Sequence, residues 1–275
     1  MSALQGRRIA LLEARMHGEL ADLVRRHGGE PYSVPAVREV PLPCAEEVSA
    51  FIDRLSNKVF QVVVFSTGVG VNGLIREAEQ LSRLDTLLTG LKDVITVCRG
   101  PKPLAALKRQ GITATIQTPE PYTTTELLAA MAVLPMAGQG IALLHYGERN
   151  AALANALQQR GAQLHELCLY EWLLPEDPGA LQGLVHDLIA AKVDAIAFTS
   201  QVQARHLWQV ADRLGLAQTL THTLNTQLAV AAVGPTCAAA LVDLGVTPHV
   251  VPAHPKMGPM IMALAAYLNN VTPRL

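Results

Sequence analysis

The stretch FQVVVFSTGVGVNGLI, residues Phe60–Ile75, predicts the basic unit of the fold. Residues 60–65 are apolar except for Gln61, and such a short run is typical of a strand buried on both faces of a parallel sheet. Ser66 and Thr67 follow directly, and Thr is a favourable residue for capping the start of a helix. The stretch therefore predicts a strand, a tight turn and a helix, the repeating unit of parallel α/β proteins.

The turn also contains G-x-G-x-x-G at Gly68, Gly70 and Gly73, the spacing of a dinucleotide-binding loop. Such a site needs an acidic residue at the carboxyl end of the next strand, where it binds ribose hydroxyls. Asp93 lies twenty residues after Gly73, but it precedes the expected strand 94–98, and Arg99 follows that strand. We therefore interpret the glycines as allowing a tight turn and close approach of a ligand, not as a nucleotide site.

The same pattern returns at residues 193–208, VDAIAFTSQVQARHLW, where Phe198 stands 133 positions after Phe65. Two further blocks repeat in the same order. Residues 8–35 resemble residues 140–167, and residues 94–121 resemble residues 228–255. Three blocks at nearly one offset predict two related α/β units within one chain. The repeats break after Pro35 and after Leu167, and both breaks lead into extended, proline-bearing segments.

Ligands of open α/β sheets bind outside the carboxyl ends of the strands, so the loops that follow the expected strands are the informative ones. Most of these loops run directly into a helix whose first backbone N–H groups can bind an anion. Any one of them taken alone is better explained as an ordinary helix cap, but six or more facing one space between the units favour a large polyanionic ligand. Basic side chains that could reinforce them are Arg15, Lys102, Arg149 and Lys256.

Composition excludes several classes of function. The chain has 275 residues, is 50% hydrophobic and carries a net charge of -1, so no strong field attracts nucleic acid or a membrane surface. The amino-terminal residues lack the apolar core of a signal peptide, and no apolar run has the length of a membrane span, so a cytoplasmic location is expected.

The cysteines are scattered and the histidines lack metal-binding spacing, which predicts no metal site. His145 and His165 are interpreted as structural residues.

The order of several motifs resembles the uroporphyrinogen-III synthase family over essentially the whole chain. The motifs are FSTGVGVNGLI, CRGPKPLAALKRQGI, YTTTELL, LLHYGERNAALANALQQRGA, LYEWLLP, DAIAFTS and AAVGPTCAAALVDLG. The resemblance implies an α/β fold of two similar flavodoxin-like parallel-sheet domains, joined by a two-stranded linker with a cleft between them. It implies a discontinuous domain 1, residues 1–36 and 172–275, and an inserted domain 2, residues 37–171.

The resemblance also implies a reaction. Linear hydroxymethylbilane is cyclised to uroporphyrinogen III with inversion of ring D and loss of water, in the biosynthesis of tetrapyrroles such as heme, siroheme and cobalamin. The family uses no cofactor and no metal. Its substrate carries eight carboxylates, which suits a cleft surrounded by helix N-termini, and catalysis depends mainly on positioning. A monomer is expected, with possible transient contact with hydroxymethylbilane synthase and no nucleic-acid or membrane partner.

Tyr170 matches the family tyrosine thought to help the hydroxyl of ring A leave as water, because a phenol is protonated at neutral pH and can donate a proton. The alternative is a linker tyrosine that packs against a domain. Its counterpart in the repeat is Val37, so it does not belong to the duplicated scaffold. The residues that we expect to bind substrate are Arg15, Thr67, Gly68, Gly100, Lys102, Tyr122, Thr123, Tyr146, Gly147, Thr199, Ser200, Gly234 and Thr236.

Three other functions fit parts of this pattern. A non-catalytic homologue could bind tetrapyrroles or another anion as a regulatory module. A two-domain solute-binding protein would also have duplicated halves, although the absence of an export signal argues against it. A nucleotide-dependent transferase is disfavoured by the position of Asp93. The ratio of type III to type I uroporphyrinogen formed from fresh hydroxymethylbilane separates the enzyme from these alternatives.

Overall fold

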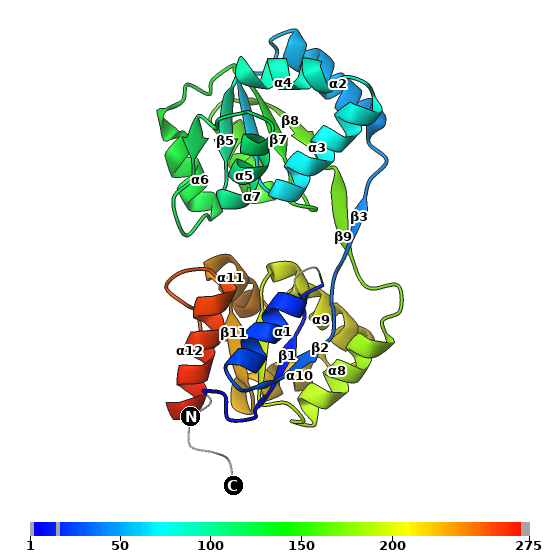
Figure 1. Ribbon diagram of the computed structural model, residues 1–275, viewed down its shortest axis with the longest axis vertical. Coiled ribbons are helices and arrows are strands. Elements are labelled where there is room, and N and C mark those ends of the chain that lie inside the picture. Colours follow the sequence, from blue (N-terminus) through cyan, green and yellow to red (C-terminus); the bar gives the residue numbers. More distant parts are fainter. Residues whose placement is uncertain (1–2, 15–16, 271–275) are drawn as a thin grey trace. The chain divides into compact units, whose positions relative to one another are not determined.

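The computed structural model describes residues 3–14 and 17–270, which divide into two compact units (Figure 1). Domain 1 combines Met1–Arg38 with Leu173–Leu275, and domain 2 is Glu39–Trp172. The sequence placed the boundaries near residues 36 and 172. Trp172 lies within domain 2 because its ring packs against Tyr146 and Tyr170 of that domain.

Domain 2 contains a five-stranded parallel sheet in the order β6-β5-β4-β7-β8. The central strand β4 (Val62–Phe65) is flanked by β5 (Ile95–Cys98) and β7 (Gly140–Leu144), and the outer strands are β6 (Ile116–Gln117) and β8 (Gln163–Leu167). Phe65 is in register with both Cys98 and Leu144. The loops that follow β4, β5 and β7 therefore begin at the same level of the sheet.

Domain 1 contains a four-stranded parallel sheet in the order β11-β10-β1-β2. The strands are β1 (Arg8–Leu11), β2 (Glu30–Ser33), β10 (Ala195–Phe198) and β11 (Ala229–Ala232), and a bridge from Ala231 to Val250 extends the sheet beyond β11. Each strand occupies the place of its sequence repeat in domain 2. The duplication predicted from the sequence is confirmed.

The two sheets share one spatial arrangement but differ in chain order. When the bridge at Val250 is counted as a fifth strand, domain 1 has the flavodoxin-like order 2-1-3-4-5. In domain 2 the strands follow the order 3-2-1-4-5, because the first strand of its sheet along the chain is β4, the equivalent of β10. Two short strands, β3 (Arg38–Pro41) and β9 (Tyr170–Leu173), form a separate two-stranded sheet at the two points where the chain passes between the domains.

Helices cover both faces of each sheet (Figure 1). In domain 2, Val63 and Phe65 face a core shared with α2 (Ala45–Ser56), α3 (Gly68–Gln80), α4 (Leu84–Lys92) and α5 (Pro101–Arg109). Val62 and Val64 face a second core with α6 (Thr124–Ala130), the 3-10 turn Met131–Val133 and α7 (Ala151–Gln159). Burial on both faces explains the continuous apolar runs in the sequence.

Domain 1 is built in the same way. One face of its sheet packs against α8 (Gly179–Ile189), α9 (Gln201–Arg213), α10 (Ala217–Thr226) and α11 (Pro235–Asp243). The other packs against α1 (His17–Arg26) and α12 (Met257–Asn270). Within residues 3–14 and 17–270, no helix is both long and apolar enough to cross a membrane.

Candidate functional site

The strongest candidate site lies at the carboxyl ends of β4 and β7 in domain 2. From β4 the chain continues through β5 to β6 on one side of the sheet, whereas β7 leads to β8 on the other. Ligands of open α/β sheets bind at this reversal of strand order, outside the carboxyl ends of the strands. Thr67 follows β4 and Gly147 follows β7, so two predicted substrate-binding residues stand at this point.

Thr67 begins helix α3. Its backbone is extended, at φ -147° and ψ 155°, and its hydroxyl accepts a hydrogen bond of 3.0 Å from the amide of Gly70. The neighbouring Gly68 permits close packing of two helices, because a Cβ there would lie 2.9 Å from the carbonyl oxygen of Lys102. Gly68 is therefore required by contact with the start of α5. The sequence also predicted a tight turn and close approach of a ligand at Gly68, and the approach of a ligand stays a prediction.

Tyr170 is the first residue of β9, and its side chain is buried, with 3% exposed. Its hydroxyl lies 3.0 Å from the hydroxyl of Thr67. The Thr67 oxygen already accepts from Gly70, but it retains its own hydrogen and a second lone pair, so it can donate to the phenol or accept from it. This pair fixes the direction of the phenol and brings together two residues that are 103 positions apart in the chain.

Gly147 makes room for the aromatic rings beside Tyr170. Its φ is +63°, a conformation that favours glycine, and a Cβ would lie 2.6 Å from Trp172 Cδ1 and 2.8 Å from Tyr170 Cε2. The Trp172 ring packs edge-on against Tyr170 at 5.4 Å between centroids and lies 5.8 Å from Tyr146. Trp172 was not among the residues predicted from the sequence, although it lies within the quoted LYEWLLP motif.

Arg99 was also not among the predicted binding residues. It follows β5, and its amide donates to the carbonyl of Phe65 at 3.1 Å. The guanidinium carbon lies 5.3 Å from the centroid of the Tyr146 ring, within the range of a cation–π contact. Burial lowers the pKa of the guanidinium, and the phenols of Tyr146 and Tyr170 act in the opposite direction. Arginine nevertheless stays charged in proteins, so a positive charge stands in this aromatic cluster.

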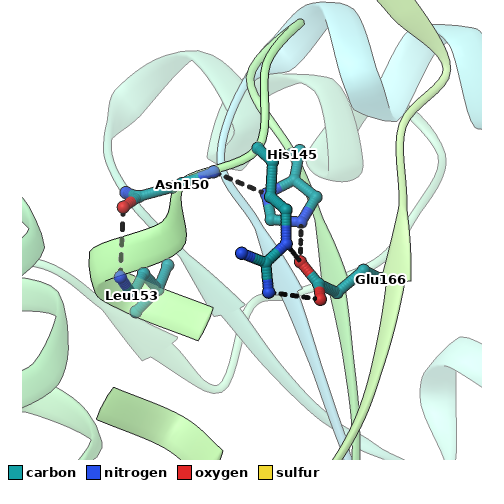
Figure 2. A network of polar contacts seen from close by, with 5 residues as sticks. His145, Asn150, Leu153 and Glu166 are labelled. Carbon is teal, nitrogen blue, oxygen red and sulfur yellow. Dashed lines mark hydrogen bonds and ion pairs between the residues drawn. The ribbon is translucent and has the colours of Figure 1, made fainter. Parts of the chain in front are cut away.

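A polar network holds the loop after β7 (Figure 2). His145 Nε2 lies 2.7 Å from Glu166 Oε2, and the amide of Asn150 donates to His145 Nδ1 at 3.3 Å. The Asn150 side chain caps α7 by accepting from the amide of Leu153 at 3.1 Å. Arg149 contacts both oxygens of Glu166, at 2.9 and 2.8 Å, so its guanidinium is occupied by this carboxylate.

The pKa values of His145 and Glu166, at the centre of this network, are both lowered, which favours a neutral imidazole and an ionised carboxylate. Burial lowers the pKa of His145 and outweighs the hydrogen bond and charge of Glu166, which raise it. Burial alone would raise the pKa of Glu166, but the hydrogen bonds from Arg149 and His145 hold it below its usual value. The neutral imidazole therefore donates to an ionised carboxylate, and both ring nitrogens of His145 are hydrogen-bonded within domain 2.

Four other predicted residues lie at the ends of β5 and β6. Gly100 caps α5, and a Cβ there would lie 3.5 Å from Tyr122 Cγ. Tyr122 donates to Glu120 Oε1 at 3.2 Å, and Thr123 caps α6 in a reciprocal arrangement with Glu126. The remaining residue, Lys102, is exposed in the first turn of α5.

In domain 1, Ser200 caps α9 together with Gln203. The Thr199 hydroxyl donates to Glu13, which follows β1 and also accepts from Gln203 Nε2 at 3.1 Å. Sequence reasoning did not select Glu13. Its carboxylate disfavours an anion beside it, so this part of domain 1 is a weaker anion site than the equivalent part of domain 2.

Two further predicted residues of domain 1, Gly234 and Thr236, lie at the start of α11. Gly234 is its N-cap, where a Cβ would lie 2.7 Å from Pro255 Cβ, and Thr236 is exposed in the first turn. Arg15 lies outside the described residues. Within the described part of the chain, no group of three or more histidine, cysteine or acidic side chains is placed to hold a metal. Burial raises the pKa of the Cys98 and Cys237 thiols to about 12, as expected for cysteines that pack as apolar residues.

Comparison with known proteins identifies the family. Residues 18–262 match the family model described as uroporphyrinogen-III synthase HemD. The chain is 30% identical over 267 residues to the uncharacterized protein YjjA of Bacillus subtilis strain 168, covering 97% of this chain and 98% of that protein. A mutant uroporphyrinogen III synthase from Thermus thermophilus is 26% identical, with a TM-score of 0.75, covering 96% of this chain and 100% of that one.

A more distant structure extends the comparison. Uroporphyrinogen-III synthetase from Helicobacter pylori 26695 is 15% identical, with a TM-score of 0.54, and the match covers 95% of this chain and 99% of that one. At this identity it supports the fold alone. The family model spans most of the sequence, and the fold is that of solved synthases. The chain therefore belongs to the uroporphyrinogen-III synthase family.

Proposed function

We propose that this protein is an active uroporphyrinogen-III synthase, which cyclises hydroxymethylbilane with inversion of ring D and loss of water. The observation that carries the proposal is the hydrogen-bonded pair of Tyr170 and Thr67 at the reversal of strand order in domain 2. A phenol in a fixed direction, at the position where open α/β sheets bind ligands, suits a reaction that must release one hydroxyl group as water.

In the proposed reaction, the Tyr170 hydroxyl donates its hydrogen to the oxygen of the departing hydroxyl. The carbon–oxygen bond breaks and water leaves, which produces a bilane cation and a Tyr170 phenolate. Ring closure then forms the new carbon–carbon bond, and loss of one proton from the macrocycle neutralises the cation and restores the phenol. Thr67 acts as a positioning residue, because its oxygen lies 3.0 Å from the phenol and 3.0 Å from the amide of Gly70. The protein contributes mainly by imposing one conformation on a chain that otherwise closes without inversion.

The eight carboxylates of the bilane need local donors, because the net charge of the protein is only -1. Helix N-termini supply such donors in both domains. Thr67, Gly100 and Thr123 cap helices of domain 2, and Ser200 and Gly234 cap helices of domain 1. The unpaired N–H groups of a first helical turn bind carboxylates without a full positive charge.

The test is to supply fresh hydroxymethylbilane and to separate the uroporphyrinogen isomers after oxidation. The wild-type protein is expected to form type III, whereas spontaneous closure gives type I. Tyr170→Phe keeps the ring against Trp172 and removes only the hydroxyl, so kcat for type III is expected to fall by about 100-fold.

Tyr32→Phe is the matched control. It also removes one phenol hydroxyl, but that hydroxyl belongs to domain 1, where it donates to Asp187 Oδ2 at 2.9 Å. Its type III formation is expected to equal that of the wild type. If the wild-type protein gives only type I at the spontaneous rate, the enzyme proposal fails and a non-catalytic tetrapyrrole-binding homologue takes its place. If Tyr170→Phe turns over normally, the role of the phenol is rejected.

A further inference from the structure

Arg99 is a half-buried arginine that no acidic group of the described residues neutralises. Within residues 3–14 and 17–270, no carboxylate forms an ion pair with its guanidinium. Arg25, Arg83 and Arg149, by contrast, each lie within 3 Å of a carboxylate oxygen. The side chain of Arg99 is half-buried, and a desolvated charge without a partner is unfavourable unless a ligand supplies one.

The backbone and one aromatic ring hold this charge in place. The Arg99 amide is bonded to the carbonyl of Phe65, and Cys98 is in register with Phe65, so Arg99 begins its loop level with Ser66. The guanidinium carbon lies 5.3 Å from the centre of the Tyr146 ring. A guanidinium that contacts a ring still has N–H donors in its plane, and these match the two oxygens of a carboxylate.

A series of ring contacts links the Arg99 guanidinium to Tyr170, the proposed proton donor. Tyr146 packs against Trp172, and Trp172 packs against Tyr170, with centroid separations of 5.8 and 5.4 Å. Burial lowers the pKa of the Arg99 guanidinium, and the phenols of Tyr146 and Tyr170 counteract this effect. An anion that binds Arg99 is therefore held beside the aromatic cluster that contains Tyr170.

We propose that Arg99 binds one acetate or propionate carboxylate of the linear tetrapyrrole through two N–H donors, and thereby places the hydroxyl-bearing ring near the Tyr170 phenol. This inference rests on the proposed function and adds a specific side-chain contact to it. It also accounts for a half-buried arginine that has an aromatic neighbour and no acidic one.

The first test is steady-state kinetics with hydroxymethylbilane. Arg99→Gln is expected to raise KM by about 10- to 100-fold, the effect of losing charge-assisted hydrogen bonds, while kcat changes much less. Arg99→Lys keeps the charge but loses the planar pair of donors. The KM of Arg99→Lys is therefore expected to lie between the KM of the wild type and that of Arg99→Gln. Arg109→Gln is the matched control, because it removes an exposed charge from the other end of α5 and is expected to leave KM unchanged.

The second test does not depend on turnover. Calorimetric titration with uroporphyrin I, which also carries eight carboxylates, is expected to show binding that Arg99→Gln weakens by about 10-fold or more and Arg109→Gln leaves intact. Thermal unfolding without ligand separates binding from folding. Removing an unpaired, partly desolvated charge is expected to leave the melting temperature unchanged or to raise it.

The outcomes are distinct. Equal KM and equal uroporphyrin affinity in Arg99→Gln and the wild type would overturn the inference, as would absence of uroporphyrin binding by the wild type. A marked fall in melting temperature with unchanged KM would assign Arg99 a structural role instead. If the wild type forms only type I uroporphyrinogen, the proposed function fails, and the uroporphyrin titration still decides whether Arg99 binds carboxylates.

Discussion

Gly147→Ala tests whether the aromatic cluster around Tyr170 controls function. The added Cβ would lie 2.6 Å from Trp172 Cδ1 and Nε1 and 2.8 Å from Tyr170 Cε2, well inside ordinary contact distance. Because these atoms belong to rigid rings, both rings must shift by about 1 Å to restore normal packing. The hydrogen bond of 3.0 Å between Tyr170 and Thr67 cannot survive such a shift with its present geometry.

The magnitude has two parts. Alanine at φ +63° costs about 1 kcal/mol relative to glycine, and overpacking adds about 1–3 kcal/mol, so the free energy of unfolding is expected to fall by about 2–4 kcal/mol. Gly111→Ala is the control. Its φ is +71°, and no heavy atom lies within 4 Å of the added Cβ, so only the backbone cost of about 1 kcal/mol applies.

Urea unfolding measures the stability of both variants, and the hydroxymethylbilane assay measures their formation of type III uroporphyrinogen. Gly147→Ala is expected to be the less stable variant and to lose most type III formation, whereas Gly111→Ala keeps it. The reasoning is refuted if both variants lose the same stability and keep the same activity, since the contact with the two rings would then have no consequence.

Two further predictions concern the residues around this cluster. Thr67→Val removes both the cap of α3 and the hydroxyl beside Tyr170, so the free energy of unfolding in urea is expected to fall by about 1–2 kcal/mol. Thr67→Ser keeps both interactions and is the control. Equal stability of the two variants would contradict the role of the hydroxyl. The second prediction concerns pH. Because the folded protein holds the pKa of His145 below 6.5, the unfolded chain binds more protons as the pH falls below that value, and stability is lost. Urea unfolding at pH 7, 6 and 5 is expected to show a shallower loss for His145→Gln than for the wild type, and parallel curves would reject the assignment.

Local sequence signals predicted the fold well. The apolar runs that end at Phe65 and Phe198 became β4 and β10, and Thr67 and Ser200 cap the helices that follow. Strand burial and helix capping depend on residues within a few positions of each other, so they can be read from a linear pattern. The sequence also predicted correctly that Asp93 precedes the strand β5, which is the wrong end of the strand for an acidic residue that binds ribose.

The candidate site was only partly predictable. Tyr170, Thr67 and Gly147 were selected, but their mutual contact was not, and Arg99, Trp172 and Glu13 were missed. One signal was available for Arg99, which stands directly after a buried strand at the edge where ligands bind. Nothing in the spacing indicated that it would lack an acidic partner, because ion pairs such as Arg149–Glu166 join side chains from different strands and loops.

The sequence by itself determined the duplicated α/β architecture, the helix starts that offer N–H donors, and the family. Only the tertiary structure decided which loops share one site. Strand order brings Thr67, Arg99 and Gly147 to the same edge of one sheet, and β9 brings Tyr170 against Thr67 across 103 positions of the chain. The physical reason is that caps and apolar periodicity are local properties, whereas the site arises from the register of β4, β5 and β7 and from packing on both faces of their sheet.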